Sequence, residues 1–221
     1  MPEPHPLPPA LRGAPFTTRS ARDHGVAASR LRRRDLAAPF RGVRRAIGDE
    51  GWMADVRAYA ALMPPHAVLS HATAARLLGI PLPTRLEDDP RVHVTALGGR
   101  APRGPGVAGH TTTRMPEVRA LGMLRVTSPA RTWADLSALL SLDELVIAGD
   151  RLRGLPSPLA TADDLVDAVH RHAGRRGRAA LGTALDFVRP GSRSPRETRA
   201  MSDAEVVART RRALRSRGWL S

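Results

Sequence analysis

The side chains best suited to chemistry in this chain are arginines crowded between positions 30 and 45. A guanidinium group is planar and can donate two parallel hydrogen bonds to a phosphate group or to the edge of a guanine base. This density of arginine therefore predicts a surface that contacts double-stranded DNA in a groove and along its backbone. The candidate DNA-contacting residues are Ser29, Arg30, Arg32, Arg33, Arg34, Arg41, Arg44 and Arg45.

A helix, a tight turn and a second short helix are expected to position the first of these residues. Hydroxyl side chains at the start of segment 17–24 can cap a helix, and Gly25 can end it because glycine tolerates a positive φ. Val26 and Leu31 then share one face of a second helix, which turns the neighbouring arginines outward. This second helix lacks a good cap, since Ala27 stands where serine or asparagine would be expected.

The remaining arginines follow a pattern typical of a two-stranded wing. Leu36, Phe40 and Val43 are apolar residues in an extended pattern that Pro39 and Gly42 interrupt. Together with the two helices, this pattern predicts a winged helix-turn-helix at the N-terminus. In such a fold, the arginines of the second helix and those of the wing would both contact phosphate groups of the DNA.

Charge is concentrated at the two ends of the chain. The chain has 35 Lys+Arg, all of them arginine, against 21 Asp+Glu, for a net charge of +14. Segment 1–48 has 10 arginines against 3 acidic residues, segment 49–174 has 13 against 14, and segment 175–221 has 12 against 4. A neutral centre with basic ends favours a polyanionic partner and predicts salt-dependent binding. The basic segments lack the bulky apolar face that a membrane surface requires, which favours nucleic acid as the partner.

Composition argues against several other classes of protein. Cysteine is absent, which excludes disulfides, thiolate zinc sites and a cysteine nucleophile. The sequence shows no signal peptide and no long apolar run, so we expect a cytoplasmic protein without a membrane span. No helical pair of histidines has metal-binding spacing, and we expect neither a metal ion nor a cofactor.

The whole chain predicts an α+β fold in which strands precede most helices. The expected strands of the central sheet are 67–69, 92–96, 107–113 and 123–127, with helices that begin near positions 52, 70, 129 and 141 and lie on one side of the sheet. Further helices are expected to begin near positions 161 and 178 in the C-terminal region. Three parts are expected. They are a winged helix-turn-helix at 1–48, a small α/β domain at 49–154 and a helical C-terminal region at 155–221.

Two His-x-Thr patterns, at His93 and His110, fall on strands that are expected to be neighbours. Paired histidines of this form perform acid–base catalysis in two-histidine phosphoesterases. The patterns are short, however, and strand alternation alone would place His93 and Thr95 on a polar face. We therefore interpret them as polar residues of a half-buried strand. His66 and His71, which flank the first strand of the sheet, are expected to be hydrogen-bonded structural residues.

Short motifs follow one another through the chain in a recognisable order. They are Phe16-Thr17-Thr18, Gly25-Val26, Leu31-Arg32-Arg33-Arg34-Asp35-Leu36, Pro39-Phe40-Arg41-Gly42-Val43-Arg44, Ser70-His71-Ala72-Thr73-Ala74-Ala75-Arg76-Leu77, Pro81-Leu82-Pro83, His93-Val94-Thr95, Val126-Thr127-Ser128-Pro129-Ala130-Arg131-Thr132-Trp133 and Gly191-Ser192-Arg193-Ser194-Pro195-Arg196-Glu197-Thr198-Arg199. This order resembles a group of actinobacterial proteins in which an AbiEi-type antitoxin-like module with a winged helix precedes a nuclease-like domain of the very-short-patch-repair (Vsr-like) endonuclease fold. The resemblance implies a role in abortive infection or promoter autoregulation, with a toxin or another protein as partner of the central domain.

The same resemblance makes Glu197 the first acidic residue of the nuclease core. A nuclease of this fold needs carboxylates at the ends of adjacent strands to hold a divalent cation. Only Asp203 and Glu205 follow Glu197, in a stretch patterned as a helix, where Ser202 would begin a capping box. We therefore expect no catalytic residues, and Glu197 is interpreted as the remnant of a nuclease-like position.

Two functional interpretations follow. The first is a DNA-binding protein that acts as an antitoxin-like transcriptional (auto)regulator and is not an enzyme. A homodimer is compatible with it, because many winged-helix proteins read two half-sites. The alternative is a truncated Vsr-like endonuclease-family protein that lacks its catalytic core and still binds DNA through its basic tail.

Overall fold

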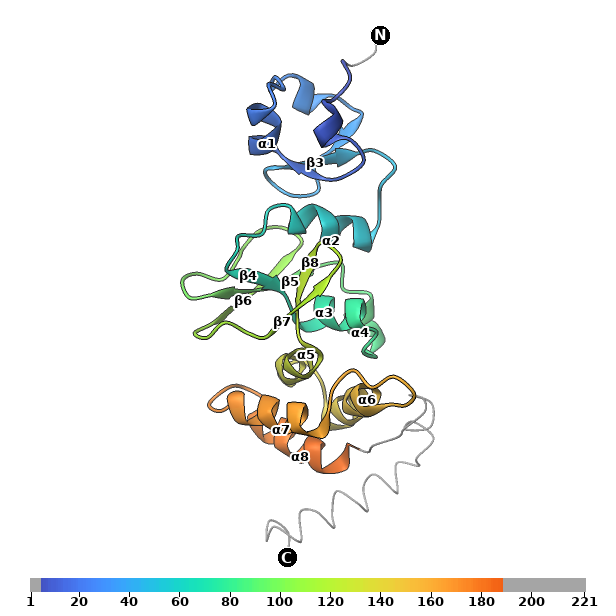
Figure 1. The fold of residues 1–221 in the computed structure, drawn as a ribbon, viewed down its shortest axis with the longest axis vertical. Helices are drawn as coiled ribbons and strands as arrows, with labels where there is room; N and C mark the ends of the chain where they lie inside the picture. Colours follow the sequence, from blue (N-terminus) through green and yellow to red (C-terminus); the bar gives the residue numbers. More distant parts are fainter. Residues whose placement is uncertain (1–4, 189–221) are drawn as a thin grey trace, which may run out of the picture. The chain divides into compact units, whose positions relative to one another are not determined.

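The computed structural model describes residues 5–188, and its mixed α+β fold confirms the predicted class (Figure 1). The described residues form eight α-helices and two sheets. They group into two units. One contains the residues up to Ala74 together with Arg85–Ser128, and the other contains Ala75–Thr84 together with the residues from Pro129 onward.

The first unit begins with a small head, which we define as residues 5–48. Its α-helix starts where the sequence predicted, because the Thr17 side chain accepts a hydrogen bond from the Ser20 backbone N–H at 3.0 Å. Three short strands form an antiparallel sheet in the order β1-β3-β2. The elements are η1 (Pro9–Leu11), β1 (Phe16–Thr17), α1 (Thr18–Asp23), η2 (Arg30–Arg32), β2 (Leu36–Ala37) and β3 (Val43–Ala46), where η marks a 3-10 helix.

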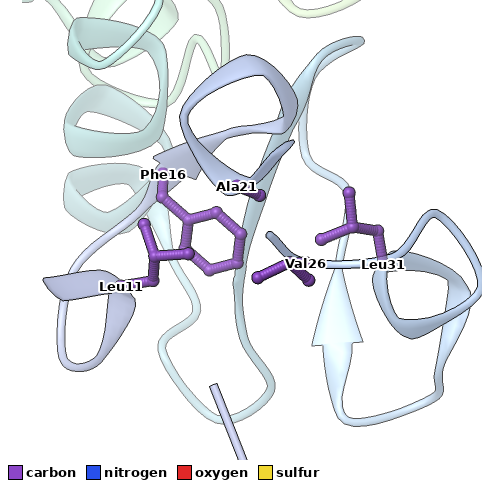
Figure 2. Close-up of a cluster of buried hydrophobic side chains, with 5 residues drawn as sticks. All are labelled: Leu11, Phe16, Ala21, Val26 and Leu31. Atoms are coloured by element: carbon purple, nitrogen blue, oxygen red, sulfur yellow. The ribbon is translucent and has the colours of Figure 1, made fainter. Parts of the chain in front are cut away.

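Five buried apolar side chains hold the head together and point toward one another in Figure 2. They are Leu11, Phe16, Ala21, Val26 and Leu31, which come from η1, β1, α1, the turn after α1 and η2. Val26 and Leu31 therefore face the core as their spacing predicted. Because each element contributes one side chain, burial of apolar surface fixes η2 relative to α1.

The second helix of the head is a single 3-10 turn. Ser29, which precedes it, is already helical with φ −65° and ψ −37° and makes no side-chain cap, while Arg33 is extended. The alanine at position 27 offers no side-chain acceptor either, and an uncapped turn has little tendency to grow into a longer helix. The predicted second helix is thus much shorter than its apolar spacing suggested, and a winged helix-turn-helix stays a prediction.

The rest of the first unit is built on a five-stranded sheet. Its strands are β4 (Ala67–Leu69), β5 (Val92–Leu97), β6 (Val107–Thr112), β7 (Val118–Leu121) and β8 (Leu124–Thr127), in the order β6-β5-β4-β8-β7. β4 pairs antiparallel with β5 and parallel with β8, β5 pairs parallel with β6, and β7 pairs antiparallel with β8. The helix α2 (Trp52–Ala60) packs against β3 and β5.

Strands β4, β5, β6 and β8 agree with the sequence prediction, whereas β7 was not predicted. β7 lies at the edge of the sheet, and Val118, Arg119 and Ala120 are all exposed. An edge strand without a buried face lacks the alternation of apolar and polar residues by which strands are recognised. Its pairing with β8 through the tight turn at Gly122 is what defines it.

The second unit is helical, and its helix starts were predicted correctly. Ser141 and Thr161 each form a capping box with the acidic residue three positions later, Glu144 and Asp164. Its long helices are α5 (Pro129–Leu136), α6 (Leu142–Arg153), α7 (Ala162–Arg171) and α8 (Arg178–Phe187). Two further helices, α3 (His71–Leu78) and α4 (Thr84–Glu87), contain the points at which the two units divide.

None of the helices within residues 5–188 combines the length and the apolar character needed to cross a lipid bilayer.

A close approach of backbone to backbone distinguishes Gly109 of β6. A Cβ atom at this position would overlap the carbonyl group of Pro102, which lies in the connection between β5 and β6. We expect Gly109→Ala to lower the free energy of unfolding by about 3 kcal/mol, since neither backbone can yield without disturbing the sheet. Urea denaturation followed by circular dichroism measures this loss.

Gly182→Ala in α8 is the matched control for this substitution. Its new Cβ atom would meet only the mobile end of the Arg178 side chain, at 3.1 Å. Replacing glycine by alanine inside a helix should then stabilise the protein by about 0.5–1 kcal/mol. If both substitutions change the free energy of unfolding equally, the close approach of Pro102 to Gly109 is not the cause of the loss.

Candidate functional site

Four of the predicted DNA-contacting arginines lie on the surface of the head. Arg32 ends η2, Arg33 and Arg34 follow it in the turn before β2, and Arg41 lies in the loop between β2 and β3. All four residues are exposed, and Ser29 is exposed as well. Within the described part of the chain, none of these side chains forms a hydrogen bond or an ion pair. They are available to an external anion.

An aromatic contact holds the loop that carries Arg41. The ring of Phe40 packs edge-on against Tyr59 of α2, with ring centroids 5.1 Å apart and an angle of 78° between the planes. Burial raises the pKa of Tyr59, so its hydroxyl group stays neutral. The position of Arg41 is therefore fixed by its neighbour, while its own side chain remains in solvent.

Arg30 does not lie on the exposed face that the sequence analysis assumed. Its Nη1 and Nη2 atoms donate to the two carboxylate oxygens of Asp35 at 2.9 and 2.7 Å, and its Nε donates to the His5 carbonyl oxygen at 2.6 Å. Only 13% of the side chain is exposed. The planar fork that could bind phosphate is thus occupied by the protein itself. Arg30 holds the N-terminal segment against the head.

Arg44 and Arg45 are also turned toward the protein. Arg44 Nε donates to the Leu31 carbonyl oxygen and its Nη1 donates to the Val43 carbonyl oxygen, both at 2.7 Å. Arg45 is 8% exposed and its Nη1 donates to Asp55 Oδ1 of α2 at 2.7 Å. These two residues tie β3 to η2 and to α2. Three of the eight predicted contact residues therefore have structural partners, and five face solvent.

Three histidines from separate elements also come together, in the first unit. His93 and His110 belong to the parallel pair β5 and β6, and His93 Nδ1 lies 3.2 Å from His110 Nε2. The ring of His71, at the start of α3, stacks on His110 with centroids 3.5 Å apart and 12° between planes. The histidines of the two His-x-Thr patterns are thus in direct contact.

A carboxylate sets the hydrogen positions in this histidine cluster. His93 Nε2 lies 3.5 Å from Asp89 Oδ2, and a carboxylate only accepts, so Nε2 carries the hydrogen and Nδ1 accepts from His110 Nε2–H. Arg91 donates to Asp89 from Nε and Nη2, at 3.0 and 2.7 Å. These hydrogen bonds from Arg91 hold the pKa of Asp89 well below its usual range.

The third histidine has an unusual backbone conformation. His71 has φ 47°, in the left-handed region that residues other than glycine seldom adopt. Its Nδ1 shares a hydrogen bond of 3.0 Å with Ser70 Oγ, which in turn accepts from Thr95 Oγ1 at 2.8 Å. Sequence reasoning foresaw a hydrogen-bonded structural histidine here, but it had no signal for the strained conformation or for the stacking.

The surroundings of the cluster favour the neutral form of the His93 and His110 rings. Burial lowers the pKa of His93, and burial together with the nearby His93 and Arg91 lowers the pKa of His110 to about 4. His93 is 3% exposed and Thr95 is 2% exposed, which corrects the expectation of a polar, half-solvated strand face. A substrate does not reach His93, and this burial argues against phosphoesterase chemistry. Across residues 5–188, no group of three or more histidine, aspartate or glutamate residues is arranged to hold a metal ion.

The second unit contains a buried serine–histidine contact that the sequence did not predict. Ser137 Oγ lies 3.2 Å from His172 Nε2, yet it donates to the Ala134 carbonyl oxygen at 2.7 Å, and His172 Nε2 also lies 3.0 Å from the Arg176 carbonyl oxygen. Both residues are about 5% exposed. The hydroxyl is thus engaged in helix-end contacts and is not a free nucleophile.

Comparison with known proteins assigns no function to these residues. No protein-family model matches the chain, and no curated protein is detectably similar to it. Glu197, the predicted remnant of a nuclease-like position, lies outside the described residues. The exposed arginines of the head are therefore the candidate site with the clearest chemistry.

The internal role of Arg30 predicts that it supports folding. Arg30→Ala should lower the free energy of unfolding by about 1–3 kcal/mol, because it leaves Asp35 and the His5 carbonyl without their charged donor. The exposed Arg34 is the matched control, and Arg34→Ala should stay within about 0.5 kcal/mol of the unmodified protein. Chemical denaturation of both variants checks this, and equal stabilities would contradict the assigned role.

The histidine cluster predicts that stability falls as the solution becomes acidic. Histidines of the unfolded chain bind protons near pH 6.5, whereas the lowered pKa values of His93 and His110 keep the folded state unprotonated to lower pH. The unfolded state therefore gains protons first, and the free energy of unfolding should decrease from about pH 7 to about pH 4.

Urea titrations across this pH range measure the effect, and His110→Gln should flatten the profile. Protonation of Asp89 also lowers the free energy of unfolding, but this effect is separable from that of the histidines. Because the pKa of Asp89 is lowered, it occurs below pH 3.8, the ordinary pKa of aspartate. If the variant and the unmodified protein have equally steep profiles between pH 7 and pH 4, the cluster is not the source of the acid sensitivity.

Proposed function

We propose that this chain is a DNA-binding protein that acts as an antitoxin-like transcriptional autoregulator. The observation that carries the proposal is the exposed set Arg32, Arg33, Arg34 and Arg41 on one head, with no partner in the described residues. An arginine held in solvent beside others of the same charge attracts a polyanion and releases its counterions.

Charge balance supports the same assignment. The first 48 residues contain 10 arginines and 3 acidic residues, and two of those arginines, Arg30 and Arg45, are neutralised by Asp35 and Asp55. Each of these carboxylates is paired with an inward-turned arginine, and neither forms an ion pair with Arg32, Arg33, Arg34 or Arg41 in the described residues. The exposed residues therefore present a concentrated positive field to solvent.

The proposed binding mode resembles that of a winged helix, with η2 in the place of the recognition helix and the β2–β3 hairpin as the wing. η2 is only Arg30–Arg32 in length, too short to lie along a major groove. We therefore assign Arg32, Arg33, Arg34 and Arg41 mainly to backbone phosphates, with the Ser29 hydroxyl as a further donor. Arg44 and Arg45 are not assigned to DNA, because they bond β3 to η2 and to α2.

The regulatory part of the proposal depends on the resemblance to AbiEi-type antitoxins. A protein of this kind binds its own promoter, and a second copy of the chain or a toxin would complete the regulatory complex. The exposed head supports the DNA-binding step only, and the two protein partners follow from the resemblance.

Fluorescence anisotropy with duplex DNA from the region upstream of the gene tests the proposal. We expect binding that weakens steeply with salt, because phosphate contacts release counterions. Replacing Arg32, Arg33, Arg34 and Arg41 by alanine should weaken binding at least about tenfold and reduce the salt dependence by about one unit of slope for each lost phosphate contact.

A charge-matched control replaces four exposed arginines outside the head, Arg100, Arg103, Arg114 and Arg119, by alanine. This variant removes the same net charge and should keep most of the affinity. An equal loss in both variants would mean that binding is diffuse and does not depend on the head. Absence of binding by the unmodified protein at low salt would refute the function altogether.

A further inference from the structure

A pocket of about 500 Å³ opens in the head beside the exposed arginines. One wall is the N-terminal segment from His5 to Pro8, a second is the turn after α1 from His24 to Ala27, and a third contains Ser29, Arg30 and Arg33. This volume lies in the range of pockets that enclose small ligands. Val26, which lines the pocket, also belongs to the core cluster shown in Figure 2.

The first wall is held in place by charged side chains. Arg30 Nε donates to the His5 carbonyl oxygen and Arg12 Nε donates to the Leu7 carbonyl oxygen, both at 2.6 Å. Leu7 packs against the core of the head. Because Arg30 is also fixed by Asp35, the segment is anchored at two points and the pocket is present before any ligand arrives.

The polar lining of the pocket suits an anion. Arg33 and Ser29 are exposed, and their side chains have no hydrogen-bond partner within residues 5–188. His24 lines the pocket and uses its Nδ1 for the Ser20 carbonyl oxygen at 2.8 Å, which leaves the other ring nitrogen. No aspartate or glutamate is among the lining residues. An anionic group entering the pocket meets donors, and the carboxylate of Asp35 next to the lining is already paired with Arg30.

The apolar lining suits a flat ring. Pro6, Pro8 and Ala27 line the pocket with apolar surface that has little conformational entropy to lose, and Val26 closes it from the core side. We propose that this pocket binds a mononucleotide, with its phosphate at Arg33 and Ser29 and its base against the prolines and Ala27. The inference goes beyond DNA binding by the head, and the same chemistry is offered by a free nucleotide and by a nucleotide of a DNA strand.

Isothermal titration calorimetry of the full chain with adenosine monophosphate, thymidine monophosphate and inorganic phosphate tests the proposal. We expect the nucleotides to bind more tightly than phosphate alone, because only they fill the apolar part. Arg33→Ala should weaken nucleotide binding at least about tenfold, the cost of a lost charge-assisted contact, and Arg34→Ala, which changes a residue outside the lining, should not.

A second variant separates filling of the pocket from loss of charge. Ala27→Phe places a ring in the pocket and leaves every arginine in place, so it should abolish nucleotide binding. If it also weakens DNA binding in the anisotropy assay, the occupant is a nucleotide of the strand. If it leaves DNA binding intact, the occupant is a free nucleotide.

Two results would overturn the inference. One is that neither nucleotide binding nor DNA binding responds to Ala27→Phe. The other is that Arg33→Ala and Arg34→Ala weaken nucleotide binding equally. Failure of the unmodified protein to bind DNA while it binds mononucleotides would refute the proposed function and leave the pocket assignment standing.

Discussion

A guanidinium group that leaves water must find acceptors for its five N–H donors, and this requirement sorts the arginines of the head. Arg30, Arg44 and Arg45 find acceptors in Asp35, Asp55 and nearby backbone carbonyl oxygens, although the buried Nε of Arg45 is left without a partner in the described residues. The other arginines remain in water, where hydration satisfies them. One residue type therefore performs two tasks in this small segment. It cross-links short elements that have little apolar surface of their own, and it supplies the charge that an anionic partner would meet.

Local rules predicted what depends on residues close in sequence. The capping boxes at Ser141 and Thr161 involve partners three positions apart, and both are present. Strand alternation also contained an unused signal, because Arg45 lies two residues after the buried Val43 and so shares its face of β3. Because arginine is charged, Arg45 was expected to be exposed, and this alternation was not used. The internal position of Arg30 had no such local marker, since it depends on η2 stopping after one turn.

The histidine cluster depends on contacts that no local pattern encodes. His71 belongs to a helix start, and His93 and His110 to two different strands, so only the sheet order and register bring the rings together. Sequence periodicity also misjudged β5, whose residues are buried on both faces where one polar face was expected. Polar side chains on such a strand must satisfy one another, and Asp89, Ser70 and Thr95 complete that internal network.

The connection between β5 and β6 is shorter than the dozen or more residues that parallel neighbours usually need. Residues 98–106 must return along a strand of roughly 20 Å, at about 3.3 Å per residue, and they do so without a helix. Little slack remains in that path, and this is why Pro102 passes so close to Gly109. In this register His93 pairs with Ala108 and Thr95 pairs with His110, so the two histidines are offset by two positions and meet diagonally across the strand pair. A longer or shorter connection that shifted β6 by one residue would turn His110 to the other face of the sheet, away from His93.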